Sequence, residues 1–417
     1  MKIAFLIERN TYFRFLGVII DEALRRGHEV FCLHDYSQPK VGSKGYQFPD
    51  IAQTPHFKNG KLVSLSYQNQ SELKEKILQK EIKAVVSLEV PAIILNLQKE
   101  LKEKGVYWVC LQNSFDIAFS GINMDKPDRF FAYTLTWTDW LFEYFKKTGK
   151  ASREKIDELK KIVGAKVKFV GFWGFGQSNA IDKNEIRRKW GIPQSKKVFL
   201  LVPFPFDSSL KHFWARFVYG MDNKFLQLFL NLFNKTNKNR FVLQIKNREN
   251  DRQLVGSIRE FCDKNNAFLL VKSRVKDPVR KYLAKMADKV LYDESFYPTT
   301  IMECLAVSDI CLSFYSTVAM ESACSGVPHI CVAPAKEDWR DLQSPYFETI
   351  FEKMGDFFNF PGVSWKLSIP QAIKKLEGAS FLDFILNENQ LEKYHQKFIG
   401  DLSGNYAANV VDEIESL

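Results

Sequence analysis

The segment Val290–Val332 constrains the fold of this chain more than any other stretch, because apolar runs and helical spacing alternate there with very short connections. Ile310–Phe314 is a short apolar run typical of a buried strand, and Val318–Ser325 has helical spacing. Gly326 and then Pro328 predict that the helix ends there. Such a dense strand–turn–helix–strand pattern is expected in an α/β protein with a parallel sheet.

The turn between this strand and this helix carries the first candidate binding residues. Ser316 and Thr317 directly precede the helix, where backbone N–H groups and the helix dipole favour a phosphate. Glu321 follows one turn later on the same face, so its carboxylate is placed to accept sugar hydroxyl groups. The alternative is an ordinary crossover helix that Ser and Thr merely cap. A phosphate site beside a hydroxyl acceptor favours a nucleotide ligand.

With Ser316, Thr317, Glu321, Gly326 and Pro328 in these places, the segment resembles the carboxyl-terminal half-site of GT-B glycosyltransferases. It is most similar to the bacterial capsule and surface-polysaccharide transferases and their CDP-glycerol glycerophosphotransferase relatives. The resemblance implies an α/β fold of two Rossmann-like domains facing a cleft, with a C-terminal helix that crosses back to the first domain. It also implies a nucleotide-sugar donor as substrate, with no cofactor and no metal.

The predicted elements divide the chain into two halves of the same kind. Residues 1–178 open with a β-α-β pattern and lack G-x-G-x-x-G after the first strand, which argues against a dinucleotide fold. Residues 179–395 restart the alternation, and residues 396–417 form a helical tail. We therefore expect an N-terminal acceptor domain, a C-terminal nucleotide-donor domain and a returning helix.

Composition narrows the class of protein. The 46% hydrophobic and 26% charged content is that of a soluble globular protein, and no run of eighteen uncharged apolar residues predicts a membrane-spanning helix. Glu8 and Arg9 interrupt the first apolar run, so no signal peptide is expected. Seven cysteines without C-x-x-C spacing predict reduced thiols, no zinc site and a cytoplasmic location.

The net charge of +10 calls for an anionic partner, such as a nucleotide-linked substrate or an anionic membrane surface. Lys146–Lys168 carries nine basic residues against three acidic ones. This segment is either a solvated helix face or a surface that docks on the inner leaflet of a membrane, and both interpretations remain open. No nucleic-acid partner is expected, because no nucleic-acid-binding motif occurs.

A second group of donor-binding candidates follows the predicted strands of the second half. Lys246 and Arg248 end one strand, and strand ends bind ligands in open α/β sheets. The related family has Lys-x-His-Pro here; this chain keeps Lys246 but has Arg248 for the His and Glu249 for the Pro. Lys and Arg would both neutralise a diphosphate. In the loop after another strand, Phe296 or Tyr297 is expected to stack on the nucleotide base. Thr299 is expected to contact the donor or to cap the next helix.

An inverting transferase needs a general base for the attacking hydroxyl group. The resemblance places this base in the first domain, at a strand end or in an adjacent loop. Glu8, Glu89 and Asp116 each follow a predicted strand, and His56 lies in a long loop. Asp116 and Glu89 are the favoured catalytic candidates.

The expected function is metal-independent transfer of a sugar from a nucleotide-sugar donor to a lipid-linked or surface-polysaccharide acceptor of the cell envelope, such as a capsule. Ser313 stands eight residues before Glu321, where many retaining relatives have a Glu, and this favours inversion. The alternatives are a CDP-glycerol-type glycerophosphotransferase, a nucleotide-sugar 2-epimerase and a non-catalytic GT-B-like scaffold. An epimerase fits less well, because residues 316–322 lack the Ser-Gly-Gly-x-x-x-Glu-Glu turn.

Overall fold

The chain forms two compact units. The computed structural model describes residues 1–37, 48–60, 62–113, 121–174, 181–203, 251–274, 279–292, 296–333, 355–401 and 404–417. The first unit comprises Met1–Gln177, Ser295–Thr299 and Glu392–Leu417, and the second comprises Ser178–Glu294 and Thr300–Leu391. Nothing in the sequence pattern indicates that the short segment Ser295–Thr299 groups with the first unit.

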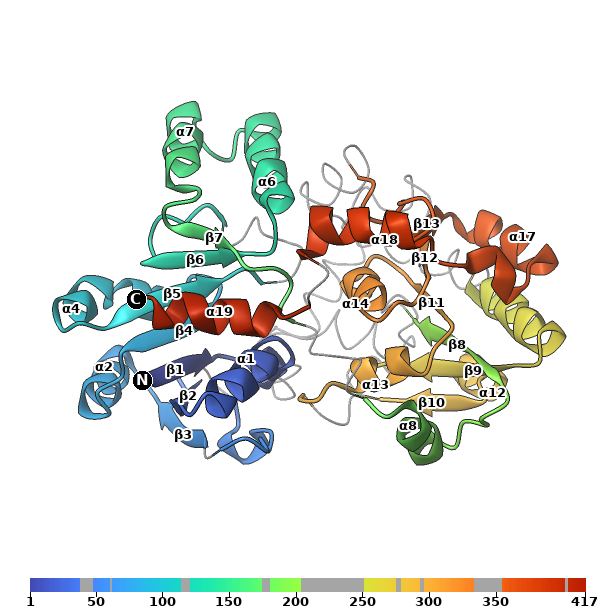
Figure 1. Cartoon of the computed structure of the whole chain (residues 1–417), viewed down its shortest axis with the longest axis horizontal. Helices are drawn as coiled ribbons and strands as arrows, with labels where there is room; N and C mark the ends of the chain where they lie inside the picture. Colours follow the sequence, from blue (N-terminus) through green and yellow to red (C-terminus); the bar gives the residue numbers. More distant parts are fainter. Residues whose placement is uncertain are drawn as a thin grey trace, which may run out of the picture. The chain divides into compact units, whose positions relative to one another are not determined.

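The first unit is built on a parallel sheet with the strand order β3-β2-β1-β4-β5-β6-β7 among the described residues (Figure 1). The strands are β1 (Lys2–Ile7), β2 (Glu29–Asp35), β3 (Leu62–Tyr67), β4 (Ala84–Leu88), β5 (Tyr107–Leu111), β6 (Arg129–Ala132) and β7 (Val167–Phe169). The central strands are almost wholly buried, as expected of a parallel sheet with both faces covered. The strand order reverses direction between β1 and β4, which is the doubly wound arrangement.

Most named helices of the first unit lie between these strands in the chain, and the last one follows them. The helices are α1 (Phe13–Arg25), α2 (Gln70–Gln79), α3 (Ala92–Leu95), α4 (Gln98–Glu103), α6 (Leu135–Thr148), α7 (Arg153–Ile162) and α19 (Tyr406–Glu415). In α1, Phe13, Leu16 and Ile20 recur at helical spacing and are buried. The helix ends at Arg25 because the next turn needs a positive φ, which Gly27 adopts at 79°.

The second unit repeats the plan with the order β10-β9-β8-β11-β12-β13. Its strands are β8 (Lys197–Val202), β9 (Ala267–Lys272), β10 (Lys289–Leu291), β11 (Ile310–Ser313), β12 (His329–Val332) and β13 (Ser364–Leu367). Its named helices are α8 (Lys183–Trp190), α12 (Lys281–Met286), α13 (Thr300–Ala306), α14 (Val318–Cys324) and α17 (Ile369–Gly378); α18 (Glu388–Tyr394) leads out of it. One apolar core lies between the sheet, the helical residues 251–264 and α17. The predicted class, two Rossmann-like domains, is confirmed.

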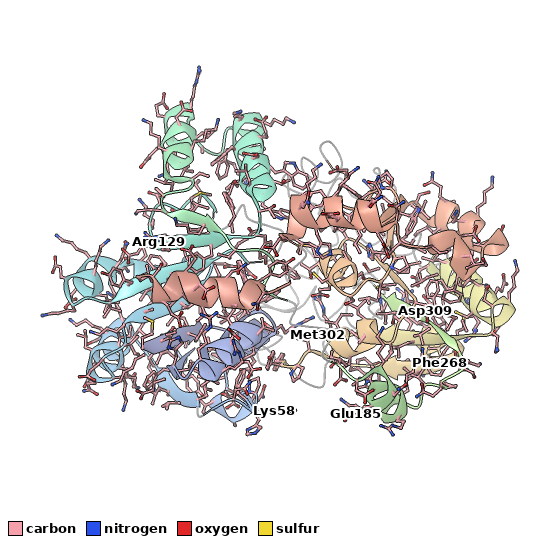
Figure 2. All side chains as sticks on the ribbon, viewed as in Figure 1. Lys58, Arg129, Glu185, Phe268, Met302 and Asp309 are labelled. Atoms are coloured by element: carbon pink, nitrogen blue, oxygen red, sulfur yellow. The ribbon has the colours of Figure 1, made fainter. Side chains whose placement is uncertain are left out.

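Aspartates hold the amino edges of both sheets. Asp309, labelled in Figure 2, directly precedes β11 and accepts hydrogen bonds from the Val198 amide at 2.8 Å and Lys197 Nζ at 2.7 Å. In the first unit, Asp128 likewise accepts from the Trp108 amide at 2.9 Å. These bonds satisfy backbone N–H groups near the start of β8 and of β5.

The end of the chain returns to the first unit, as predicted. Helix α19 packs against α1 (Figure 1). Ahead of it, Thr134 Oγ1 donates to the Lys397 carbonyl at 2.6 Å, and Trp137 Nε1 donates to the Phe398 carbonyl at 2.8 Å. Because these donors are buried, the returning segment is required to satisfy them.

Arg26 joins α1 to the returning helix. Its guanidinium group donates to the carboxylates of Asp412 and Glu415 and to the Ala408 carbonyl. It also donates to Glu22, which Arg25 contacts too. Arg25 therefore offers a matched comparison: both arginines bind Glu22, and Arg26 also binds α19.

We expect Arg26→Ala to lower the free energy of unfolding by about 1–2 kcal/mol, because several charge-assisted hydrogen bonds to α19 are lost. Arg25→Ala removes an exposed pair within one helix and should cost clearly less than Arg26→Ala, because water screens such a pair. Urea unfolding of both variants measures the difference. Equal losses would contradict a stabilising role for this contact.

Candidate functional site

Both sheets have one point where the strand order reverses, and ligands of open α/β sheets bind outside the carboxyl ends of the strands at such points. In the first unit this point lies between β1 and β4, which are followed by Glu8 and Glu89. In the second unit it lies between β8 and β11, and Ser316 and Thr317 follow β11 closely. The two positions therefore contain several of the residues predicted from sequence.

The first position carries four residues in one row, here called the carboxylate row: Tyr67, Asp35, Glu8 and Glu89. Asp35 pairs with Tyr67, and Ile7 pairs with His34, so the next residue, Glu8, stands beside Asp35. The register of β1 with β4, carried forward along both strands, brings Glu8 level with Glu89. Neighbouring strands lie about 4.8 Å apart, so the three carboxylates are close neighbours.

Glu8 is the half-buried centre of this row. The pKa of its carboxyl group is raised to about 7, chiefly by burial and then by the negative charges of Asp35 and Glu89, whereas Arg9 and a hydrogen bond from Tyr12 act in the opposite direction. A carboxyl group with this pKa is partly ionised at neutral pH and takes up a proton readily. These are the properties required of a general base.

Glu89, one of the two favoured catalytic candidates, is held in an unusual conformation. Its φ of 63° lies in the left-handed region, which non-glycine residues rarely adopt. Its carbonyl oxygen accepts from Ser87 Oγ at 3.0 Å and from Cys110 Sγ at 2.6 Å, and its carboxylate accepts from Asn113 Nδ2 at 2.5 Å. The surrounding groups therefore fix Glu89 within the row, and its role as the base stays a prediction.

Two other base candidates came from the sequence. Asp116 lies outside the described residues, and His56 is exposed in a loop.

His34, which was not a candidate, directly precedes Asp35 of the carboxylate row in β2. It is fully buried, with Nδ1 2.9 Å from the Pro49 carbonyl, and burial lowers its pKa to about 4. Its imidazole is neutral at pH 7 and packs as a core group. Asp35 was not singled out from sequence, although a polar residue that closes an apolar strand is a usable signal.

At the second position, the Val318 amide donates to Ser316 Oγ at 3.3 Å. Thr317 is the N-cap residue of α14, and its side chain accepts no capping hydrogen bond. The local contact of Ser316 agrees with capping, the alternative drawn from the sequence, whereas Thr317 does not cap through its side chain. Phosphate binding by Ser316 and Thr317 stays a prediction.

Glu321 lies on the buried side of α14, with only 5% of its surface exposed. The pKa of the Cys311 thiol is raised to about 12, chiefly by burial and also by the charge of Glu321, against a hydrogen bond with Ser322. Carboxylates are rarely buried to this extent. The position is therefore specialised, although its contact with a sugar hydroxyl is untested.

Lys272 is a cation that sequence reasoning missed. It closes β9 and is 4% exposed. The registers of β9 with β8 and of β8 with β11 bring Lys272 level with Val202 and Ser313. Two strand spacings, about 10 Å, separate it from the end of β11. In the sequence, the signal that could have revealed this residue is a lysine at the end of an apolar run.

The remaining donor candidates divide into three cases. Lys246 and Arg248 lie outside the described residues. Thr299 is buried directly before α13. Tyr297 belongs to the first unit, where its ring stacks on Phe57 with centroids 5.2 Å apart and its hydroxyl donates to Asp21 Oδ2 at 3.1 Å.

The ring of Tyr297 packs against Phe57 and against Gly17, where an added Cβ would overlap it. These contacts make the ring part of the packing of the first unit. Its stacking on a nucleotide base stays a prediction.

Across the described residues, no three His, Cys, Asp or Glu side chains are grouped so as to hold a metal ion. In the same part of the chain, no helix combines the length and the apolar character needed to cross a membrane.

No known family profile matches the sequence, and no curated protein matches it. Solved structures do match. The wall teichoic acid polymerase TagF has a TM-score of 0.56 and 11% identity, with all of this chain and 88% of TagF covered. UDP-GlcNAc 2-epimerase from Neisseria meningitidis, bound to UDP-GlcNAc, has a TM-score of 0.54 and 10% identity, with both chains fully covered.

A complex of S. aureus MnaA with UDP has a TM-score of 0.52 and 10% identity, covering 99% of this chain and 96% of that one. At these identities the likeness establishes the fold alone. The fold is GT-B, as the sequence motifs predicted.

We expect Gly17→Ala to lower the free energy of unfolding by about 1–3 kcal/mol, because the new methyl group meets the Tyr297 ring. Gly256→Ala is the matched control: it lies among helical residues with nothing within 4 Å of the added Cβ, so it should be neutral or stabilising. Thermal unfolding compares the two. An unchanged melting temperature for Gly17→Ala would contradict the close packing of the Tyr297 ring against Gly17.

The raised pKa of Glu8 predicts a pH-dependent stability cost. The folded carboxyl group titrates at about 7 and the unfolded one near 4.5, so the folded state holds its proton more tightly and stability falls as the pH rises between these values. Glu8→Gln should therefore raise the melting temperature more at about pH 8 than at about pH 5. Glu29→Gln, an exposed change at the opposite sheet edge, should show no such difference. A lower melting temperature for Glu8→Gln at both pH values would contradict the assignment.

Proposed function

We propose that the chain is a glycosyltransferase that moves a sugar from a nucleotide-sugar donor to a hydroxyl group of a surface-polysaccharide or lipid-linked acceptor. The proposal rests on one observation, the opposite charge of the two carboxyl edges in a GT-B fold. The carboxyl edge of the first unit carries Glu8, Asp35 and Glu89, whereas that of the second unit carries the buried Lys272 at the end of β9 and Ser316 after β11. An anionic diphosphate is attracted by the second edge and repelled by the first.

The donor is assigned to the second unit. Lys272 supplies a buried positive charge at the strand end, and Lys246 and Arg248 are further cations for the diphosphate. Departure of the nucleotide builds negative charge on this diphosphate, and fixed cations and N–H donors stabilise it without a metal. Glu321 would accept a hydroxyl group of the ribose or sugar.

Inversion of configuration is the stereochemistry that these residues favour. A single displacement needs a base for the acceptor hydroxyl, and the carboxylate row offers one. Ser313, which stands where many retaining relatives have a Glu, is engaged in the sheet: its hydroxyl donates to the Phe314 carbonyl at 2.8 Å and lies 2.8 Å from His329 Nε2.

A cytoplasmic location is part of the proposal. All seven cysteines, each within the described residues, are free thiols, which suits a reducing compartment. Peripheral attachment to a membrane would use the basic segment Lys146–Lys168. Several of its lysines also make contacts within the unit: Lys155 pairs with Asp125, and Lys160 lies over the Phe142 ring.

Two other activities are kept because specific observations favour them. A nucleotide-sugar 2-epimerase is supported by the full mutual coverage with the Neisseria meningitidis enzyme. A glycerophosphotransferase of the CDP-glycerol type is supported by the likeness to TagF, which was also solved after a soak with CDPG. A scaffold without activity would bind no activated donor.

Titration calorimetry with UDP-, CDP-, GDP- and CMP-linked donors tests the proposal. One class of nucleotide should bind, and Lys272→Ala and Glu321→Gln should each weaken that binding by about 1–3 kcal/mol, because each removes a charge that meets the donor. Absence of binding by every nucleotide would favour the scaffold. Isomerisation of the donor without an acceptor would identify an epimerase.

Two controls keep this test specific. Lys289→Ala removes an exposed lysine at the amino end of β10, the opposite edge of the same sheet, and should leave the affinity unchanged. The melting temperature of each variant shows whether the buried Lys272 and Glu321 are needed for folding. A variant that stays folded and binds the donor as the wild type does would remove that residue from the site.

A further inference from the structure

The carboxylate row includes a buried polar group that lacks a hydrogen-bond partner. Tyr67 is fully buried, and within the described part of the chain its hydroxyl oxygen has no hydrogen-bond partner. Burial and then the charges of Asp35 and Glu8 raise the pKa of this hydroxyl group, which places it beside the carboxylates. A buried hydroxyl group without a partner is costly, and a ligand at the row would supply one.

Asn10 provides a second unsatisfied group close to Glu8 in the chain. It is fully buried and its Nδ2 donates to Gln53 Oε1 at 2.6 Å, whereas its Oδ1 has no partner among the described residues. The two groups without a partner are thus an amide oxygen, which accepts hydrogen bonds, and a phenol hydroxyl. The carboxylates of the row already accept from the Ser37 amide, Tyr12 and Asn113, and a carboxylate has capacity for further donors.

The chemistry of this set defines what it recognises. Carboxylates and an amide oxygen bind ligands that donate several O–H groups, and they repel phosphate. Within the described residues, the acidic groups are not arranged to hold a metal ion. A neutral polyhydroxylated molecule fits all of these conditions.

We infer that the carboxylate row is the acceptor site, that it takes a neutral sugar or other polyol, and that Glu8 is the catalytic base that removes the proton from the attacking hydroxyl group. This inference rests on the proposed function for its reaction and names the acceptor class. Glu8 is at the centre of the row, with Asp35 on one side and Glu89 on the other. Asn113 already holds Glu89, which suits Glu89 to positioning.

The transfer step is balanced as follows. The Glu8 carboxylate takes the hydroxyl proton while the acceptor oxygen forms a bond to C1 of the donor sugar. The bond from C1 to the diphosphate oxygen breaks, and its electron pair leaves with the nucleoside diphosphate. Neutral Glu8 then returns its proton to water. The charged groups around Glu8 are Asp35, Glu89 and Arg9, and the Tyr12 hydroxyl donates to it.

Acceptor binding is tested without any donor. Saturation-transfer NMR on the whole chain should detect binding of glycerol and of methyl glucoside at about millimolar concentrations, the range of weak ligands. Tyr67→Phe should weaken this binding at least about fivefold, Glu29→Gln should not, and inorganic phosphate should not compete. Absence of polyol binding, equal binding by Tyr67→Phe, or competition by phosphate would overturn the acceptor site.

The role of Glu8 is tested by nucleoside diphosphate release from the donor that binds in calorimetry, with concentrated glycerol as acceptor. The wild-type rate should rise as Glu8 ionises through about pH 7. Glu8→Gln should lose this rise and about 100-fold in kcat, with donor affinity unchanged. A rate within about threefold of the wild type, or a retained rise, would exclude Glu8 as the base.

The two experiments separate this inference from the function on which it rests. If no nucleotide binds the wild-type chain, the proposed transferase fails, and the NMR experiment still decides whether the row binds polyols. If a nucleotide binds and polyols do not, the transferase stands and the row is not its acceptor site.

Discussion

Every strand of a parallel sheet delivers its carboxyl end to the same edge, and this constraint determines the chemistry of the molecule. In the first unit, the registers of β2, β1 and β4 place three carboxylates side by side at strand spacing. Burial of Glu8 and the charges of its two neighbours oppose ionisation of Glu8, so it retains its proton to an unusually high pH. The buried strands resist this repulsion because their pairing and packing are made along their whole length.

The same plan appears in the second unit with the opposite charge. There Lys272 ends β9, and Ser316 and Thr317 follow β11. Both sheets reverse their strand order at an equivalent place, so one architecture yields two edges of contrasting electrostatics. The proposed transfer would use this contrast, because positive charge stabilises a leaving diphosphate and an attacking hydroxyl group needs a base. The fold is shared with unlike enzymes, and the side chains at the edges decide the reaction.

Much of the fold was readable from sequence. The strand Ile310–Ser313 and helix Val318–Cys324 were predicted within a residue, because apolar runs, Gly326 and Pro328 mark their limits locally. The return of the last helix followed from a motif resemblance. Local signals of this kind depend on neighbours in the chain and need no knowledge of distant contacts.

The site was harder to predict. Glu8 was recognised as a strand-end residue but not preferred, since its elevated pKa depends on Asp35 and Glu89, which β-strand register brings beside it. Lys272 closes its strand without a motif around it. The packing of Tyr297 within the first unit could not be predicted from the sequence, because no local pattern reveals which unit a loop residue contacts. Pairing register and long-range packing are properties of the assembled fold, and they determined these outcomes.

The first unit is discontinuous, and this affects how it is made. Its helix α1 packs on α19, and Arg26 bonds to Asp412 and Glu415 near the far end of the chain. On the ribosome, the sequence of the second unit is translated before α19 exists, so the earlier-made unit cannot be completed until α19 has been synthesised. Until then the nascent chain exposes the apolar surface that α19 will cover. A chain truncated before α19 would thus be prone to aggregation and chaperone capture.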